Sequence, residues 1–272
     1  LSSVEAQVFR SSWQDEPDRT WVGSDFWANR LQDWRLREGR LECVAKKNLP
    51  MRTVHLLTHR LRSRDGDFEL SVRTGPILRE GEGPHPSSER GVLLGAGGHE
   101  MDYRAAALVH QWAGPGAGIF VGVDGTGALF VRDFAQTAVS KPVSGGDDLP
   151  SEVTLKIWGQ TNGPMTTLKV VAGDKTIETE LPFDRLMGNI ALVSNGKPGK
   201  GQQAWFSDLE VGGKGVKVDP EAAFGPIAAT QYTLSFDVMK MTAQLMSIGE
   251  TDSRTAFPVS YTHLTLTTKL AV

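Results

Sequence analysis

The chain has 272 residues, of which 29 are basic and 32 acidic, so its formal net charge is −3. Hydrophobic residues make up 39% of the chain, and 30 glycines add to them, a composition typical of a folded globular protein rather than a disordered one. Lys and Arg form no basic block, so no nucleic-acid partner is expected. No apolar run approaches the roughly 18 residues of a membrane span, so no membrane span is expected.

Near the N-terminus, Ser24 is placed to cap a short helix over Asp25–Trp34, in which Phe26, Trp27 and Leu31 contribute to a partial apolar stripe. The first thirty-four residues also contain four tryptophans. They can close one end of the fold, or they can form a platform on which sugar rings stack. The tryptophans are Trp13, Trp21, Trp27 and Trp34.

Most of the remaining chain alternates apolar and polar residues and is interrupted by turn residues, which is typical of an all-β sandwich or barrel. The single cysteine, Cys43, lies in such an alternating run and is expected to be an inert core thiol, so no disulfide and no cysteine-based zinc site is expected. The further predicted strands, in chain order, are Asp67–Arg73, Gly91–Ala96, Ala105–Val109, Ile119–Val123, Ala128–Val131, Glu152–Trp158 and a strand containing Leu168 and Val170. Asp124–Gly127 is the clearest hairpin turn.

Linker-like residues after Val211 predict a domain boundary. We expect a jelly-roll β-sandwich over 10–215, a linker over 216–230, and the first strands of a truncated β-sandwich module over 231–257. The strands of that module are Gln231–Phe236 and Val238–Met246. Residues 258–272 are expected to be a non-native tail, because 259–268 resembles the translation of a sequencing-library adapter. On this interpretation the chain is a metagenome-derived fragment.

No residue pattern in the sequence predicts a catalytic or metal site. His55 and His59 are four residues apart on a predicted strand, about 13 Å from one another, which is too far to share one ion. Among the acidic residues near strands, Glu69, Asp102, Asp133 and Glu152 are candidates for a glycosidase pair only if they lie close together in space. We therefore expect no catalytic residue and no metal ligand in this chain.

The segment Met101–Trp112 is the part of the sequence richest in groups that can bind a ligand. Arg104 can form paired hydrogen bonds with a carboxylate or with sugar hydroxyls, and Tyr103 or Trp112 can stack. The alternative is an ordinary salt bridge at the end of a strand. The predicted ligand-binding residues are Trp27, Asp102, Tyr103, Arg104, His110 and Trp112.

Several stretches resemble the N-terminal region of secreted bacterial alkaline phosphatase D-like metallophosphatases. The resemblance covers nearly all of the chain from Trp13 to about Phe257 and rests on Ser12–Arg19, Phe26–Arg35, Gly39–Cys43, Gly66–Glu69, Asp102–His110, Phe224–Ile227 and Gln231–Ser235. It implies a concanavalin A/laminin-G-like jelly roll, then an immunoglobulin- or fibronectin-like module, and then a calcium- and iron-dependent phosphoesterase domain. The family's metal ligands lie in that last domain, and no position here matches them.

This resemblance implies that the chain is the non-catalytic front of an exported enzyme, secreted or periplasmic, which positions a phosphatase domain in cis on its substrate, on a glycan or on cell-surface polysaccharide. The chain itself is then not an enzyme and needs no cofactor. The alternative is a stand-alone carbohydrate-binding or glycan-active jelly roll, similar to the keto-disaccharide hydrolase-like domains. A third possibility is a purely structural sandwich that packs against the following enzyme.

Overall fold

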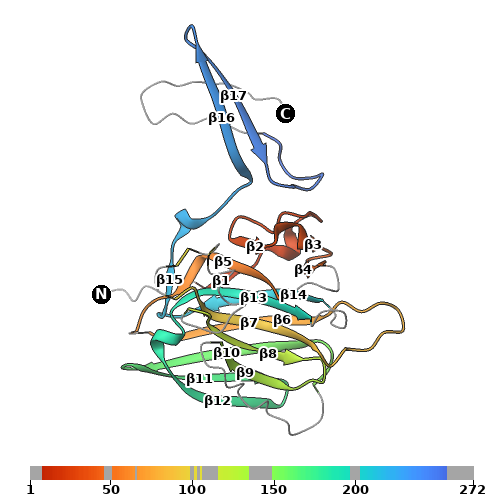
Figure 1. Cartoon of the computed structure of the whole chain (residues 1–272), viewed down its shortest axis with the longest axis vertical. Helices are drawn as coiled ribbons and strands as arrows, with labels where there is room; N and C mark the ends of the chain where they lie inside the picture. The colour runs from red at the N-terminus through yellow and green to blue at the C-terminus, as the bar shows by residue number, and fades with distance from the viewer. Residues whose placement is uncertain are drawn as a thin grey trace.

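The chain folds into an antiparallel β-sandwich from which a two-stranded ribbon projects (Figure 1). The computed structural model describes residues 8–45, 51–64, 66–98, 101–102, 105, 116–134, 149–196 and 203–255. Short 3₁₀ helices connect some of the strands, namely η1 (Trp13–Asp15), η2 (Leu31–Asp33), η3 (Phe183–Arg185) and η4 (Pro220–Ala222). The all-β sandwich predicted from the alternating sequence is confirmed.

The first sheet, sheet A, has eight strands among the described residues. Their order is β12 (Lys175–Pro182), β11 (Met165–Ala172), β10 (Val153–Asn162), β6 (Phe68–Pro76), β14 (Ala204–Gly212), β4 (Arg40–Cys43) and β3 (Trp34–Arg37), with β1 (Phe9–Arg10) paired to β14. One face of this sheet is apolar and buried, because alternate residues such as Leu70 and Leu155 point into the core. The opposite face carries mostly polar and charged side chains.

The second sheet, sheet B, has seven strands in the described part of the chain. Their order is β15 (Val216–Val218), β5 (Arg52–Leu61), β13 (Gly188–Gly196), β7 (Ser88–Ala96), β8 (Ile119–Asp124) and β9 (Leu129–Asp133), with β2 (Phe26–Asn29) paired to β5. Every residue of Gly91–Ala96 is buried, as the continuous apolar run predicts. Its outward residue Leu93 joins Phe120 and Phe130 in a second apolar cluster, so sheet B is buried on both faces there.

The predicted hairpin at Asp124 joins β8 to β9. The Asp124 carboxylate accepts hydrogen bonds from the backbone N–H groups of Thr126 (2.8 Å) and Ala128 (3.0 Å), which fixes the turn. Gly125 has no room for a side chain, because a Cβ there would lie 1.7 Å from the carbonyl oxygen of His85. The turn chemistry read from the sequence is confirmed.

The predicted helix over Asp25–Trp34 is wrong. The chain forms β2, then η2, and enters β3 at Trp34. Phe26 and Ala28 alternate inward from β2, whose residues pair with Thr53–Leu56 of β5. Pairing with a neighbouring strand outweighs the weak local helical stripe.

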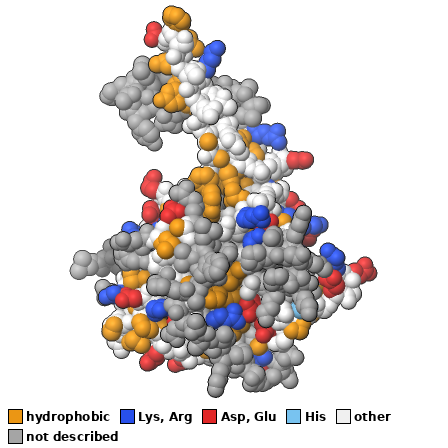
Figure 2. All heavy atoms as spheres, viewed as in Figure 1, with side chains coloured by type: hydrophobic (Ala, Val, Ile, Leu, Met, Phe, Trp, Pro, Cys, Tyr) orange, Lys and Arg blue, Asp and Glu red, His pale blue; other side chains and the backbone are white. Residues whose placement is uncertain are grey.

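The ribbon consists of β16 (Ile227–Ser235) and β17 (Val238–Leu245), which confirms the two strands predicted there. Two contacts join its base to the sandwich. The backbone N–H of Trp21 donates to the Ser247 carbonyl oxygen (3.0 Å), and the Arg19 guanidinium contacts the Asp252 carboxylate (2.5 Å). Beyond this base the ribbon stands away from both sheets, and Figure 2 shows hydrophobic side chains along it and at its base.

Candidate functional site

The outer face of sheet A carries two grooves that combine a tryptophan with charged side chains. One lies over β10, β6 and the end of β14, and we call it the Trp158 groove. The other lies over β3, β4 and the opposite ends of β6 and β14, and we call it the Trp205 groove. The Trp158 groove is lined by Val8, Glu69, Leu70, Ser71, Lys156, Trp158, Glu210, Val211 and Gly212, and the Trp205 groove by Arg37, Glu38, Arg40, Glu42, Pro76, Ile77, Leu78, Ser151, Glu152 and Trp205.

The Trp158 groove has a volume of about 200 Å³. Trp158 points outward because its neighbours along β10, such as Ile157, fill the core, and its side chain is half-buried. It lies opposite Glu69 of β6, while Lys156 lies opposite Ser71. Within the described part of the chain, no hydrogen bond or ion pair engages the side chains of Glu69 or Lys156. The groove therefore offers an aromatic face beside a free carboxylate, an ammonium group and a hydroxyl.

The Trp205 groove is larger, about 370 Å³. Trp205 is only 4% exposed, because the guanidinium carbons of Arg40 and Arg73 lie 4.9 and 5.6 Å from the ring centroid. The ring lies against Gly75 on β6, where a Cβ would be 2.7 Å from its Cζ2 atom. Only a glycine at this position allows the ring to lie flat across the strand.

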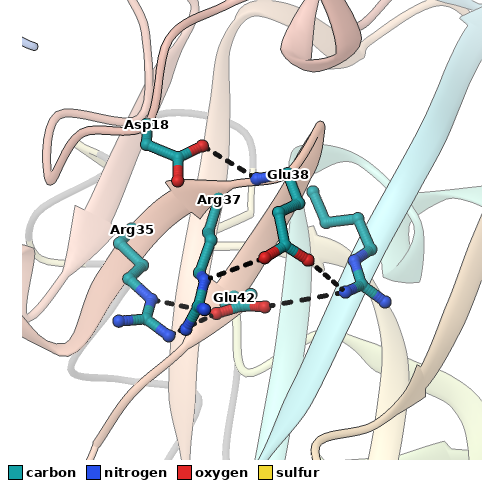
Figure 3. A network of polar contacts seen from close by, with 6 residues as sticks. Asp18, Arg35, Arg37, Glu38 and Glu42 are labelled. Carbon is teal, nitrogen blue, oxygen red and sulfur yellow. Dashed lines mark hydrogen bonds and ion pairs between the residues drawn. The ribbon is translucent and has the colours of Figure 1, made fainter.

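A network of ion pairs forms one wall of the Trp205 groove (Figure 3). The Arg35 Nε and Nη2 groups donate to the same Glu42 oxygen, at 2.9 and 2.8 Å. Glu38 lies in the turn between β3 and β4, where its backbone N–H donates to Asp18 (2.8 Å). Its carboxylate, 63% exposed, lies 3.3 Å from the Arg37 Nε atom and 3.6 Å from Arg40 Nη2.

The far wall of the Trp205 groove is positioned by a buried arginine. Arg90 of β7 donates to the Ser151 carbonyl oxygen (2.6 Å), and Glu152 beside it pairs with Arg73 (2.8 Å). Burial lowers the pKa of Arg90 to about 10, which Asp124 partly opposes. The guanidinium therefore remains charged at neutral pH and holds the segment that begins β10 in place.

The residues predicted from the sequence are placed as follows. Trp27 is half-buried on β2, and its ring packs edge-on against Phe224 at 5.3 Å, beside the base of the ribbon. Asp102 is exposed. Tyr103, Arg104, His110 and Trp112 lie outside the described residues, as does the predicted strand Ala105–Val109 apart from Ala105.

The four acidic candidates are not gathered in one place. Glu69 lies in the Trp158 groove and Glu152 in the Trp205 groove, while Asp133, on β9 of the other sheet, pairs with Arg185 (2.5 Å). Among the residues that the structure describes, no group of three His, Cys, Asp or Glu side chains is placed to hold a metal ion. None of the described helices is long and apolar enough to cross a membrane.

Sequence reasoning missed both grooves, although one signal was present. In the alternating strand Glu152–Trp158, the outward positions are polar except for the last, where a tryptophan stands. A large aromatic side chain on the polar face of a strand indicates a contact with something beyond the core. Trp205 gives a similar signal. Its neighbours Ala204 and Phe206 are apolar and fill the core, so the side chain between them must point to the outer face of the strand.

No family model and no curated protein matches the chain, so the resemblance to alkaline phosphatase D-like proteins gains no support from these comparisons. Solved structures do match. Lectin I-B4 from Griffonia simplicifolia, in its metal-free form, aligns with a TM-score of 0.50 and 9% identity over 76% of this chain and 99% of the lectin chain. Peanut lectin aligns at 0.49 and 11% identity over 79% and 100%, and the Emp47p carbohydrate recognition domain at 0.46 and 12% identity over 78% and 98%.

The first of these likenesses defines the fold class: the sandwich is a concanavalin A-like jelly roll of the kind that lectins adopt. At 9% identity the likeness concerns the fold alone. The predicted jelly-roll fold class is confirmed.

Proposed function

We propose that this chain is a carbohydrate-binding jelly-roll domain, and that the Trp158 groove holds a sugar ring. This function is the alternative raised by the sequence. We prefer it to the other function raised there, the accessory region of a phosphoesterase. The observation that carries it is the half-buried Trp158 on an outward strand position, beside Glu69 and Lys156, whose side chains have no other partner among the residues that the structure describes.

The chemistry of the groove suits a sugar. The apolar face of a pyranose ring packs against an aromatic face, and its hydroxyl groups need both acceptors and donors around that face. Glu69 supplies an acceptor, Lys156 a donor, and Ser71 both. The lectin likeness supports the proposal at the level of the fold, since proteins of this fold include lectins solved with sugars, among them the Bauhinia forficata lectin with GalNAc. By the same reasoning we propose that the domain acts outside the cell.

The proposal is tested by screening the purified chain on a glycan array and then titrating the best ligand by calorimetry. The variant Trp158→Ala is expected to lose about five- to thirtyfold in affinity, since an aromatic contact of this kind contributes about 1–2 kcal/mol. The matched control is Tyr232→Ala, which removes a 68% exposed aromatic ring from the ribbon. Equal loss in both variants, or no glycan bound by the wild type, would refute the proposal.

The segment 101–112 remains a second place where a glycan can bind. Arg104→Ala and Trp112→Ala in the same titration test it directly. Loss of affinity in these variants and not in Trp158→Ala would move the binding site to that segment.

A second candidate function, the front region of an exported alkaline phosphatase D-like phosphoesterase, is favoured by the ribbon. A two-stranded ribbon is marginal on its own, and β16–β17 leaves large apolar side chains such as Leu234 and Val238 exposed, as the opening strands of a further module would. The genomic sequence beyond residue 272 tests this, because a following phosphoesterase domain must contain Asp, His and Asn metal ligands.

A further inference from the structure

The charged groups of the Trp205 groove are not equally engaged by one another. The groove is lined by two arginines, Arg37 and Arg40, and by three carboxylates, those of Glu38, Glu42 and Glu152. Two further arginines, Arg35 and Arg73, lie beside the groove and pair with Glu42 and Glu152. The carboxylate of Glu42 is buried, and its Oε2 atom is already engaged by two N–H groups of Arg35. The carboxylate of Glu152 is engaged by Arg73.

Arg37 and Arg40 are left to share Glu38. The Arg37 contact is 3.3 Å long, and the Arg40 contacts with Glu38 and Glu42 are 3.6 and 4.0 Å long, longer than the ordinary range for a charged hydrogen bond. No hydrogen bond within the described residues joins either guanidinium to Glu38. These two arginines therefore have donors available beside an exposed carboxylate that can turn away into solvent.

The Arg40 guanidinium is nevertheless held in place. It lies 4.9 Å above the Trp205 ring, and that ring is fixed from below by Gly75. A guanidinium stacked on an aromatic face keeps its N–H edge directed outward, which suits it to bind a planar carboxylate or a sulfate. The groove thus presents an ordered donor, with space of about 370 Å³ in front of it.

The two grooves share β6. Glu69 of the Trp158 groove and Gly75, which supports Trp205, are six residues apart on this strand, about 20 Å at the usual rise per residue. Arg73 lies between them on the outer face and contacts Trp205. An extended chain of several sugar units can therefore follow β6 and reach both grooves.

We propose that the Trp205 groove binds the anionic group of an acidic sugar, so that the ligand of this domain is an acidic polysaccharide chain bound along β6. The proposal rests on the carbohydrate-binding function proposed above. The incoming carboxylate or sulfate takes the place of the Glu38 carboxylate between Arg37 and Arg40, while another unit of the same chain packs on Trp158. Carboxylated and sulfated sugars share this chemistry.

The test compares three oligosaccharides of equal length in calorimetric titrations: a uronic acid oligomer, a sulfated oligomer and a neutral one. Wild type is expected to bind one of the acidic ligands more tightly than the neutral one, and the stronger of the two identifies the anionic group. Arg40→Gln is expected to lower that affinity about tenfold and leave the neutral ligand unchanged. Glu38→Gln is expected to raise the affinity for the acidic ligand severalfold, because it removes the competing carboxylate.

Arg64→Gln is the matched control, since Arg64 is exposed and lies outside the groove. Thermal unfolding of each variant establishes that it is folded. Two outcomes would overturn this inference and leave the carbohydrate-binding proposal intact. One is equal affinity for neutral and acidic ligands with no effect of Arg40→Gln. The other is a loss of affinity for the acidic ligand in Glu38→Gln. A wild type that binds none of the three and no glycan on the array would overturn both.

Discussion

The buried ion pair between Asp33 and Arg52 is expected to be a major determinant of stability. Arg52 of β5 donates from Nε to the Asp33 carboxylate at 2.5 Å, and the two side chains are only 5% and 11% exposed. Asp33 immediately precedes β3, so the pair joins the edge of sheet A to sheet B. Asp33→Ala leaves the Arg52 guanidinium buried without this carboxylate.

Loss of one partner of a buried ion pair costs about 3–5 kcal/mol. For a domain of this size about 1 kcal/mol corresponds to 2–4 °C, so Asp33→Ala is expected to lower the Tm by about 6–20 °C. Urea unfolding followed by circular dichroism measures the free energy of unfolding, and calorimetry measures the Tm. The control is Arg10→Ala, which breaks an exposed ion pair with Glu210 (68% and 46% exposed) and should cost at most about 1 kcal/mol. Similar small effects in both variants would refute the assignment of Asp33–Arg52 as a buried structural pair.

Three further predictions follow from particular contacts. Gly75→Ala is expected to displace the Trp205 ring and to lower the free energy of unfolding in urea by about 1–3 kcal/mol. It should also lower the affinity for the acidic oligosaccharide. Unchanged stability would mean that the ring has room to move. Cys43 is 1% exposed, and burial raises the pKa of its thiol to about 11. A thiol reagent at pH 8 should therefore label it only after unfolding. Rapid labelling of the native chain would contradict its burial. At the ribbon base, burial raises the pKa of Asp252, but hydrogen bonds from the Gly249 N–H and Arg19 outweigh this and hold the pKa below its usual value. The contribution of Asp252 to the stability of the ribbon base is therefore present above about pH 4 and lost as the pH falls through that lowered pKa. The protection factor of the Trp21 backbone N–H against hydrogen exchange should fall in acid in the wild type and depend less on pH in Asp252→Asn.

Alternation along the sequence predicted several of the strands that have one buried face. The predicted segments Asp67–Arg73 and Glu152–Trp158 correspond to β6 and β10, because their inward residues must be apolar to fill the core. Prediction failed at Asp25–Trp34, where the local stripe is compatible with a helix and only pairing with β5 selects a strand. Such pairing joins residues some thirty positions apart and leaves no local signal.

The candidate site was less predictable than the fold, for a topological reason. Its residues come from strands far apart in the sequence, since Trp158 and Glu69 are neighbours only because β10 pairs with β6. Likewise Trp205 meets Gly75 and Arg40 only because β14 lies between β6 and β4. Alternation reveals which residues of one strand point outward, but it does not reveal the order of strands in a sheet.

The two faces that the fold turns outward have different chemistry, and this difference restricts where a ligand can bind. The outer face of sheet B is apolar around Leu93, Phe120 and Val193, all of which are fully buried, so these side chains stabilise the fold and are not available to a partner. The outer face of sheet A keeps its polar groups accessible and still contains two tryptophans, one half-buried and one covered by two guanidinium groups. A ring under guanidinium groups contributes rigidity to those groups, whereas an uncovered ring offers its own surface. The two grooves therefore differ in role: Trp158 is suited to contact a sugar directly, and Trp205 is suited to hold the arginines that select its charge.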